Sequence, residues 1–186
     1  MRVRTTGLEG LLLVEPEVRR DDRGFFLEAY QQRHFAEAGI RDQFVQDNHS
    51  RSKQGVLRGL HYQDLSAPMS KLVRCPSGSI LDVAVDLRVG SQTFGTWFAA
   101  ELSDTNMHQL FIPVGFAHGF LTLSPWADVE YKCGGYYDPK AEGAIAWNDK
   151  DLNISWPIDA PVLAPRDASA ISLQQYLERP AFHYRP

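Results

Sequence analysis

The sequence predicts an all-β fold, a β-sandwich or β-barrel with only a few short helices. Short runs rich in Val, Phe, Tyr, Thr and Leu recur along the chain, and a succession of short strands is typical of sandwiches and barrels. Gly, Pro, Asn and Asp separate these runs, and few helical stretches lie between them. The expected strands are residues 25–30, 55–62, 79–87, 94–102, 116–123 and 128–133.

The expected strand at residues 79–87 shows a regular alternation of side-chain type. Because successive side chains of a strand point to opposite faces, this alternation predicts a strand with two distinct faces. One face carries Leu81, Val83, Val85 and Leu87, and the other carries Asp82, Ala84 and Asp86. A barrel needs such strands, and its interior is either packed or left as a ligand cavity.

Two short helices are expected, at residues 32–38 and 171–178, because a glycine follows the first and a proline the second. The Pro-rich tract 157–165 indicates an ordered arm that leaves the barrel. Since no repeat or long linker divides the chain, residues 1–186 are expected to form one domain. It would have an N-terminal strand segment and a C-terminal arm with a helix.

Composition excludes several classes of protein. The formal net charge of −4 argues against a nucleic-acid partner, which would usually select a basic face. No stretch has the length and apolarity of a membrane span or a signal peptide, so no membrane partner is expected. Cys75 and Cys133 are too few for a disulfide framework, and buried free thiols in a reducing cytoplasm are expected.

Polar residues are densest at residues 44–52 and 55–63. If residues 55–63 form a regular strand, Arg58 and Tyr62 share one face and His61 lies on the other. A lone strand histidine is usually structural. His61 gains interest because other reactive side chains recur in neighbouring strand-like segments, namely Lys71, His118 and Tyr131.

A metal site is a second interpretation of these histidines. Cupin barrels usually bind metal through a His-x-His motif, a following Glu and one further His. Here the first half is His61-Tyr62-Gln63, with glutamine in place of the second histidine, and His118 stands in the second half. Two histidines and a glutamine are a poor ligand set for Zn or Fe, so no metal is expected.

At these residues the sequence resembles the dTDP-4-dehydrorhamnose 3,5-epimerase family, a branch of the cupin superfamily. The resemblance implies a homodimeric, cupin-type jelly-roll barrel that acts on a dTDP-4-keto-6-deoxy sugar without a cofactor, in the cytoplasm. The matching segments are residues 22–28, 44–52, 58–63, 71–74, 82–88, 112–120, 131–133, 147–149 and 154–157, with Tyr137 and Glu142.

The resemblance also implies roles for individual residues. His61 would be the base, Tyr131 the proton donor and Lys71 the group that supports charge on the substrate, while Asp167 would orient His61. The residues expected to bind the substrate are Arg23, Phe26, Glu28, Gln46, Asp47, Asn48, Arg58, His118, Tyr137, Glu142 and Arg166. Arg166 stands where the family usually has lysine, and Pro68-Met69-Ser70 replaces a usual glycine before Lys71.

Epimerisation next to a ketone requires a base, an acid and a cation, the roles that the resemblance implies for His61, Tyr131 and Lys71. Loss of the proton at C3 or C5 of a 4-keto sugar gives an enolate, for which a neutral histidine is a suitable base. Reprotonation from the opposite face requires a separate acid, and a lysine can stabilise the oxyanion. The structural alternatives are that Lys71 is a solvated edge-strand lysine and Tyr131 an ordinary core tyrosine.

Three other functions stay open at this point. The first is a mono-epimerase acting at C3 or C5 only, which would share nearly all these residues. The second is a metal-dependent cupin enzyme, and the third is a sugar-nucleotide-binding module without activity. The dimer has some support from residues 10–14, which are apolar enough to pair outside their own barrel.

Overall fold

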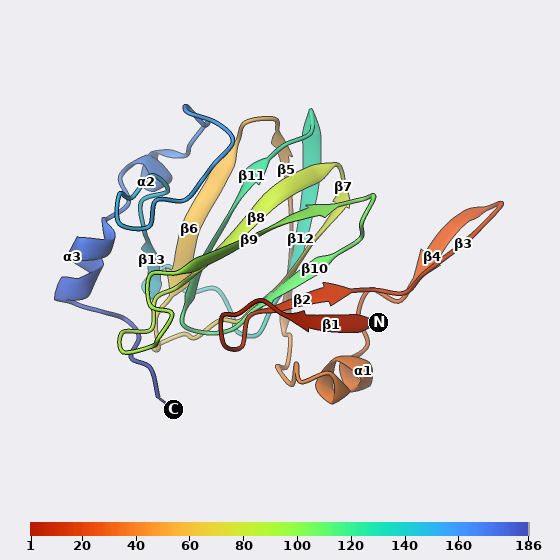
Figure 1. Ribbon diagram of the computed structural model, residues 1–186, viewed down its shortest axis with the longest axis horizontal. Coiled ribbons are helices and arrows are strands. Elements are labelled where there is room, and N and C mark those ends of the chain that lie inside the picture. Colours follow the sequence, from red (N-terminus) through yellow and green to blue (C-terminus); the bar gives the residue numbers. More distant parts are fainter. Residues whose placement is uncertain (186) are drawn as a thin grey trace.

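Two antiparallel β-sheets face each other in the computed structural model, which describes residues 1–185 (Figure 1). The six-stranded sheet contains, in spatial order, β1 (Arg2–Thr5), β2 (Leu12–Glu15), β10 (Gln109–Ile112), β7 (Lys71–Ser77), β12 (Trp126–Cys133) and β5 (Gln46–Lys53). The five-stranded sheet contains β13 (Glu142–Ala144), β6 (Leu57–Gln63), β11 (Phe116–Thr122), β8 (Ser79–Asp86) and β9 (Trp97–Ser103). This arrangement confirms the predicted all-β fold.

Outside the two sheets lie a hairpin and three short helices. The hairpin pairs β3 (Val18–Asp21) with β4 (Gly24–Leu27), and it projects from the body of the molecule (Figure 1). The helices are α1 (Gln32–Glu37), α2 (Pro165–Ala168) and α3 (Leu173–Glu178). The expected helices correspond to α1 and α3, while α2 was not foreseen because it has only four residues.

The alternation predicted for β8 is confirmed, with both faces buried. Ile80 and Ala84 pack between the two sheets, in a core that includes Val73 of β7 and Val129 of β12. Val83, Val85 and Leu87 point the other way, toward the C-terminal part of the chain. The barrel therefore has a packed interior on one side of β8 and a second apolar layer on the other.

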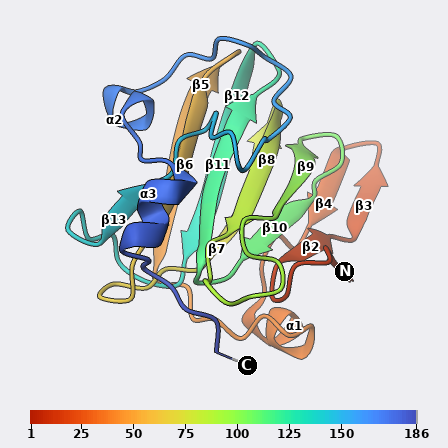
Figure 2. The same ribbon diagram turned by 60° about the vertical axis from the view of Figure 1, so that its left-hand side comes forward.

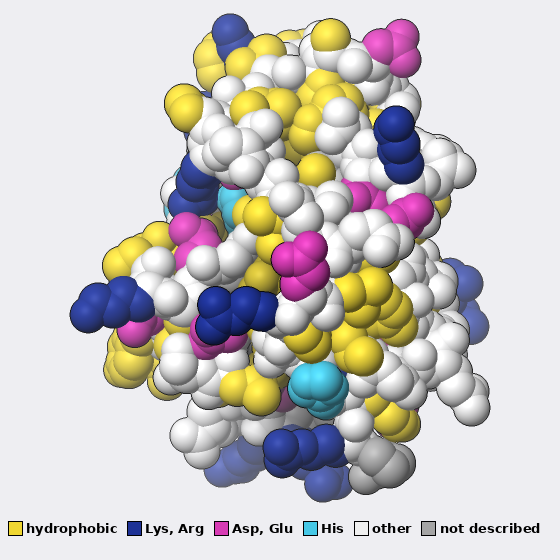
Figure 3. Space-filling view, turned by 90° about the vertical axis from the view of Figure 1, so that its left-hand side faces the viewer, with side chains coloured by type: hydrophobic (Ala, Val, Ile, Leu, Met, Phe, Trp, Pro, Cys, Tyr) yellow, Lys and Arg dark blue, Asp and Glu magenta, His cyan; other side chains and the backbone are white. Residues whose placement is uncertain are grey.

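Segments outside the barrel cover the outer faces of the sheets (Figure 2). Leu173, Tyr176 and Phe182 close the apolar outer face of the five-stranded sheet. On the surface of this C-terminal covering, charged and polar side chains separate the exposed apolar ones (Figure 3). Phe35 of α1 and Ile40 pack on the outer face of the six-stranded sheet. These layers fix the sheets and leave the polar end of the barrel open.

β6 and β11 lie unusually close together at two glycines. A Cβ atom added to Gly59 would stand 2.5 Å from the Gly119 Cα, and one added to Gly119 would stand 2.7 Å from the Arg58 carbonyl oxygen. Gly59 also has a positive φ of 125°, which side chains disfavour. Glycine is therefore required where β6 carries Arg58 and His61 past β11.

The structure changes two expectations, one about residues 10–14 and one about the arm after Pro157. Residues 10–14 do not pair outside their own barrel, because β2 lies between β1 and β10 of the same sheet and Val14 is fully buried. The prediction of external pairing there is wrong. The arm after Pro157 turns back onto the barrel, where the Leu57 N–H donates to the Val162 carbonyl at 3.0 Å. It thereby carries α2 to β6.

Cys75 and Cys133 are buried free thiols, as predicted. Burial raises the pKa of the Cys75 thiol to about 12. Within residues 1–185, no helix is both long and apolar enough to cross a membrane.

Candidate active site

His61 and Asp167 form a hydrogen-bonded pair at the open end of the barrel. His61 lies on β6, and α2 begins with Pro165 and carries Asp167. His61 Nε2 lies 2.6 Å from Asp167 Oδ1, and the Gly59 N–H donates to Oδ2 at 3.4 Å. Because a carboxylate only accepts, Nε2 carries the proton in this bond and Nδ1 is the ring nitrogen left for a substrate.

The Asp167 carboxylate is only 2% exposed. Burial acts to raise its pKa, but the hydrogen bond and charge of His61, with help from the Gly59 N–H and Arg166, outweigh burial and lower it. Asp167 is therefore an anion at neutral pH, able to fix the imidazole ring and to stabilise its protonated form.

Tyr131 and Lys71 face this pair from the opposite sheet. A cavity of about 290 Å³ is lined by His61 of the five-stranded sheet and by Lys71 and Tyr131 of the six-stranded sheet. Lys71 Nζ lies 5.9 Å from the centroid of the Tyr131 ring. β7 lies between β10 and β12, so Lys71 is not a solvated edge-strand lysine.

Burial dominates the ionisation of both groups. It raises the pKa of the Tyr131 phenol, which therefore keeps its proton at neutral pH. It lowers the pKa of the Lys71 ammonium, although the nearby Cys133, Asp82 and Glu142 oppose the change. The cavity thus holds a protonated phenol and a buried lysine side chain near the His61 ring.

Arg58 lines the same cavity as His61, so the predicted placement of Arg58 on the opposite face is wrong. The register explains the difference. His118 pairs with His61 and Phe120 pairs with Arg58, so three steps along β6 face two steps along β11. A β-bulge of this kind rotates the next side chain to the other face. Arg58 Nε then donates to Ser52 Oγ at 3.0 Å.

His118 forms a second buried histidine–aspartate pair. It lies directly opposite His61 in the sheet and lines the cavity, and its Nε2 is 2.8 Å from Asp82 Oδ1. His118 is 6% exposed and Asp82 is fully buried. No role was predicted for Asp82, although the acidic residues on one face of its strand were a signal.

A further cavity of about 480 Å³ continues from His61, Lys71 and Tyr131 to the rim. Its wall contains a connected set of polar groups. Glu142 accepts from the Tyr137 hydroxyl at 3.1 Å and from Arg166 at 2.9 Å. Gln46 Nε2 donates to Asn48 Oδ1 at 3.0 Å. Five predicted binding residues therefore meet at this rim.

Asp47 lines the rim too, but its carboxylate turns outward. There it accepts from Lys132 Nζ at 2.9 Å, on the outer face of the six-stranded sheet. This placement leaves Asp47 poorly directed for a role in the inner cavity.

Arg23, Phe26 and Glu28 are not brought to the cavity by their own chain. Arg23 and Phe26 belong to the β3–β4 hairpin, where Arg23 pairs with Asp21 and Phe26 is 68% exposed. Glu28 follows β4, and its Oε1 lies 2.7 Å from His34 Nδ1. None of these three residues lines the two cavities that contain His61.

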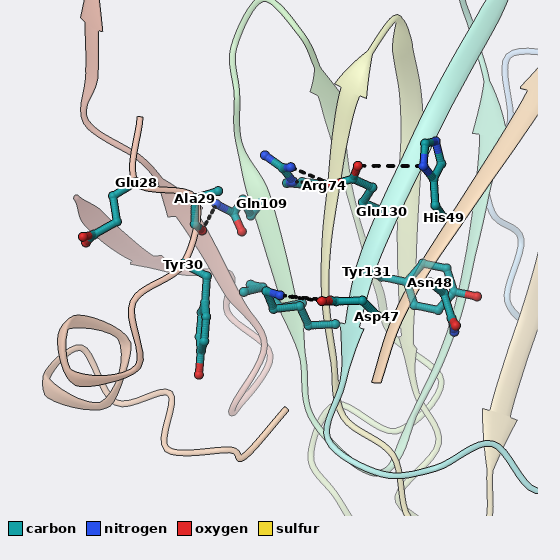
Figure 4. A pocket seen from close by; sticks show the side chains of 12 residues that line it. Glu28, Ala29, Tyr30, Asp47, Asn48, His49, Arg74, Gln109, Glu130 and Tyr131 are labelled. Atoms are coloured by element: carbon teal, nitrogen blue, oxygen red, sulfur yellow. Dashed lines mark hydrogen bonds and ion pairs between the residues drawn. The ribbon is translucent and has the colours of Figure 1, made fainter. Parts of the chain in front are cut away.

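A larger groove of about 560 Å³ lies on the outer face of the six-stranded sheet (Figure 4). Glu130 pairs there with Arg74 at 2.6 Å, and His49 approaches Glu130 from β5. The Tyr131 side chain lies on the other side of the sheet from Glu130 (Figure 4). Since the groove contains neither His61 nor Lys71, the inner cavity is the better candidate site.

Gln63 stands where metal-binding cupins usually have their second histidine, and it has a structural use here. Gln63 is buried, and its amide donates to the Ala67 carbonyl at 2.7 Å and accepts from the Asp138 N–H at 2.7 Å. Gln63 therefore holds two loops to the barrel. Within residues 1–185, no group of three or more His, Cys, Asp or Glu side chains is arranged to hold a metal ion.

Residues 5–175 match the family described as dTDP-4-dehydrorhamnose 3,5-epimerase. A Salmonella typhimurium protein of that name is 50% identical over 179 residues, 95% of this chain and 98% of the relative. A Streptomyces niveus protein named dTDP-4-dehydrorhamnose 3-epimerase is 41% identical over 176 residues, 94% of this chain and 85% of the relative.

Solved structures agree with these sequence matches. The crystal structure of a dTDP-6-deoxy-D-glucose-3,5-epimerase from Legionella pneumophila, in complex with dTDP-4-keto-L-rhamnose, matches with a TM-score of 0.95 and 45% identity. The match covers 100% of this chain and 99% of that one. It confirms the expected cupin-type jelly-roll fold.

Proposed function

Because the chain belongs to the dTDP-4-dehydrorhamnose 3,5-epimerase family, we propose that it converts dTDP-4-keto-6-deoxy-D-glucose to dTDP-4-keto-L-rhamnose. The reaction inverts C3 and C5, so the protein is an isomerase. The observation that most supports this function is the shared cavity between His61 and Tyr131, which come from opposing sheets. A base and an acid on opposite walls match the need to remove a proton from one face and return one to the other.

His61 is the base in this proposal. Its Nδ1 takes the proton from the carbon next to the ketone, and the electron pair moves onto O4 to give an enolate. Asp167 holds the ring through Nε2 and stabilises the imidazolium that forms.

Tyr131 returns a proton to the opposite face of the same carbon. Burial raises the pKa of its phenol, so it carries a proton to give. Lys71 lies beside Tyr131 and supplies positive charge to O4 in a partly desolvated cavity, where such stabilisation is strong.

The remaining wall of the two cavities binds the nucleotide part. Arg58 and Arg166 offer guanidinium groups, which suit diphosphate oxygens. Gln46, Asn48 and Tyr137 lie at the rim, where they would contact the nucleoside. Glu142 holds Arg166 and Tyr137 in position.

A homodimer completes the site. Phe25 and Phe26 are 54% and 68% exposed on a hairpin that projects from the body, and an adjacent pair of exposed phenylalanines favours a partner surface. In the dimer, the hairpin of one copy would bring Arg23, Phe26 and Glu28 to the rim of the other. Light scattering that shows a monomer at micromolar concentration would contradict this arrangement.

Deuterium uptake tests the function directly. Incubation of dTDP-4-keto-6-deoxy-D-glucose with the protein in D₂O should label C3 and C5, as followed by NMR. Label at one carbon only would identify a mono-epimerase instead, the activity named for the Streptomyces niveus relative.

Substitutions test the two roles. His61→Ala and Tyr131→Phe should each abolish turnover while dTDP affinity stays within about three-fold, because neither group contributes uniform binding. His183→Ala and Tyr184→Phe, on the C-terminal segment away from the cavity, are matched controls that should keep full activity. A wild-type protein that binds dTDP without any isotope exchange would be a binding module.

A further inference from the structure

The buried amide of Gln63, at the end of β6, is bonded to two separate loops. Its Nε2 donates to the Ala67 carbonyl at 2.7 Å and to the Tyr136 carbonyl at 3.2 Å. Its Oε1 accepts from the Asp138 N–H at 2.7 Å. Gln63 is only 7% exposed, and both ends of its amide are bonded to backbone groups. Although it lines the cavity at the rim, its amide is therefore engaged with the protein rather than free for a ligand.

The two loops, residues 64–70 and 134–141, also contact each other directly. The Gly134 N–H donates to the Ser70 carbonyl at 2.9 Å. A Cβ atom added to Gly134 would overlap the Ser70 hydroxyl, so the loops pack closely at this point. Gln63 thus joins two loops that form one packed unit at the rim.

Tyr137 stands between the two backbone groups of the second loop that Gln63 binds. Its N–H donates to Gln46 Oε1 at 3.2 Å, and its hydroxyl donates to Glu142 at 3.1 Å. Gln46 belongs to β5 of the six-stranded sheet and Gln63 to β6 of the five-stranded sheet. Two glutamines, one from each sheet, therefore hold residues 136–138 across the open end of the barrel.

The ring held in this way is available to a ligand, because Tyr137 is 49% exposed and lines the rim cavity. A binding group that is already fixed does not lose freedom when the ligand arrives, which raises affinity. We propose that Gln63 is a positioning residue for nucleotide binding, which fixes Tyr137 at the rim before dTDP binds. This inference rests on the proposed function, because it concerns the nucleotide part of the same substrate.

The positions of the proposed catalytic groups do not depend on the Gln63 amide. Lys71 lies on β7 between β10 and β12, and Tyr131 lies on β12 between β7 and β5, so strand pairing holds both. His61 is bonded to Asp167 on α2. Loss of the Gln63 amide should therefore weaken nucleotide binding without slowing the chemical step.

A double-mutant cycle tests whether Gln63 acts through Tyr137. Gln63→Met keeps the approximate volume of the side chain but removes its bonds to both loops. It should weaken dTDP by roughly 10-fold in isothermal titration calorimetry, since a loop that is correctly placed about a tenth of the time lowers the apparent affinity by that factor. In the Tyr137→Ala background, the same change should alter dTDP affinity by no more than about two-fold.

Equal weakening of dTDP with and without the Tyr137 side chain would overturn the inference. That result would mean that Gln63 contacts the nucleotide itself or supports the barrel as a whole. Coupling between the two substitutions is the result that neither of these roles produces.

Steady-state kinetics separates binding from chemistry. For Gln63→Met, KM should rise in step with the dTDP dissociation constant while kcat stays within about three-fold of wild type. A fall in kcat with an unchanged KM would overturn the inference, because the substitution would then act on the catalytic groups.

Gln54→Met is the matched control. Gln54 also donates from Nε2 to a backbone carbonyl, that of Leu123 at 2.7 Å, but it lines neither cavity that contains His61. It should keep wild-type dTDP affinity and turnover. Weakening of dTDP equal to that of Gln63→Met would overturn the specific role of Gln63.

Hydrogen exchange in the wild-type protein tests the same inference without a substitution, and so does not depend on the folding of Gln63→Met. The N–H groups of Tyr137 and Asp138 donate to Gln46 and Gln63, so NMR should show both protected from exchange before dTDP is added. Protection that arises only when dTDP binds would overturn the inference, because the ligand rather than Gln63 would then order the rim.

The outcomes separate this inference from the proposed function. A protein that shows the expected coupling between Gln63 and Tyr137 in dTDP binding, but no isotope exchange on the keto sugar, would refute the proposed function alone. An active epimerase whose Gln63→Met variant binds dTDP as tightly as wild type would refute this inference alone. Thermal unfolding checks that each variant is folded under the conditions of the assay.

Discussion

The chemistry proposed for His61 depends on a chain of contacts as well as on the imidazole itself. The ring is held by Asp167, and Asp167 in turn accepts from the Gly59 N–H two residues before His61 on β6. The carboxylate is almost fully buried, so water cannot replace it as the partner of Nε2. The proposed base is therefore set in orientation and tautomer before substrate binds.

Asp167→Asn tests this dependence. The amide can occupy the same space, but it carries no charge and can reverse the hydrogen bond. Turnover should fall by about 10²–10⁴-fold, the range expected for loss of an effective general base, while dTDP affinity is kept. Steady-state kinetics measures the turnover, and isothermal titration calorimetry measures the dTDP affinity.

Asp159→Asn is the control for that change, since Asp159 is exposed and lies outside both His61 cavities. It should behave as wild type. Unchanged turnover in Asp167→Asn would show that His61 is oriented by other contacts.

At the scale of elements, β8 links the cavity to the packing of the barrel. Asp82 is hydrogen-bonded to His118, which lines the cavity, and Asp86 ends the strand as a fully buried carboxylate. Asp86 accepts from Arg88, Ser91 and Thr93, and so fixes the turn that follows β8. A single strand thus carries two buried carboxylates, one bonded to a histidine of the cavity wall and one that fixes a turn.

Asp86 should make the free energy of unfolding depend on pH in the acidic range. Burial acts to raise its pKa, but hydrogen bonds from Arg88, Thr93 and Ser91 outweigh burial and lower it. A carboxyl group whose folded pKa is depressed contributes stability above its unfolded pKa, near 3.9, and loses it as pH falls through the folded value.

Urea unfolding between pH 2 and pH 7 measures this contribution. We expect wild-type stability to decrease below about pH 4 and Asp86→Asn to show a shallower decrease. At pH 7 the variant should be less stable by about 1–3 kcal/mol, the usual effect of disrupting a buried charged hydrogen-bond network. Equal stability of the two proteins at pH 7 would rule out this contribution.

At the scale of the whole molecule, a single chain supplies only part of the proposed site. The inner cavity has the proposed base, acid and cations, whereas Arg23 and Phe26 lie on the projecting hairpin. A dimer that exchanges hairpins would join the two parts, because each copy offers what the other cavity lacks.

Mixing inactive variants tests that exchange. A chain with His61→Ala keeps an intact hairpin, and a chain with Arg23→Ala and Phe26→Ala keeps an intact cavity. After unfolding and refolding together, random pairing should restore about a quarter of wild-type sites, one in each mixed dimer. Activity assays and light scattering follow the recovery.

A mixture of His61→Ala with Tyr131→Phe is the control. Both residues line one cavity of the same chain, so every mixed dimer should stay inactive. Equal recovery in the two mixtures, or none in the first, would contradict hairpin exchange.

Some of this protein could be predicted from local sequence. The strands with alternating apolar residues were found because period-two patterning is local, and β8 shows it on both faces. β5 was missed because its sequence is almost entirely polar, and its inward residues Asn48 and Ser50 line cavities rather than a core. The family resemblance supplied the expected roles of His61, Tyr131 and Lys71.

By itself, then, the sequence determined which residue types are available, where most strands run and which family the chain resembles. Only the tertiary structure decided which side chains meet. It brought Asp167 to His61 across 106 residues, turned Arg58 into the cavity at a bulge, placed Asp82 behind His118, and left the hairpin outside. The physical reason is that strand register, bulges and crossings depend on pairing between distant segments, and local propensity carries no information about that pairing.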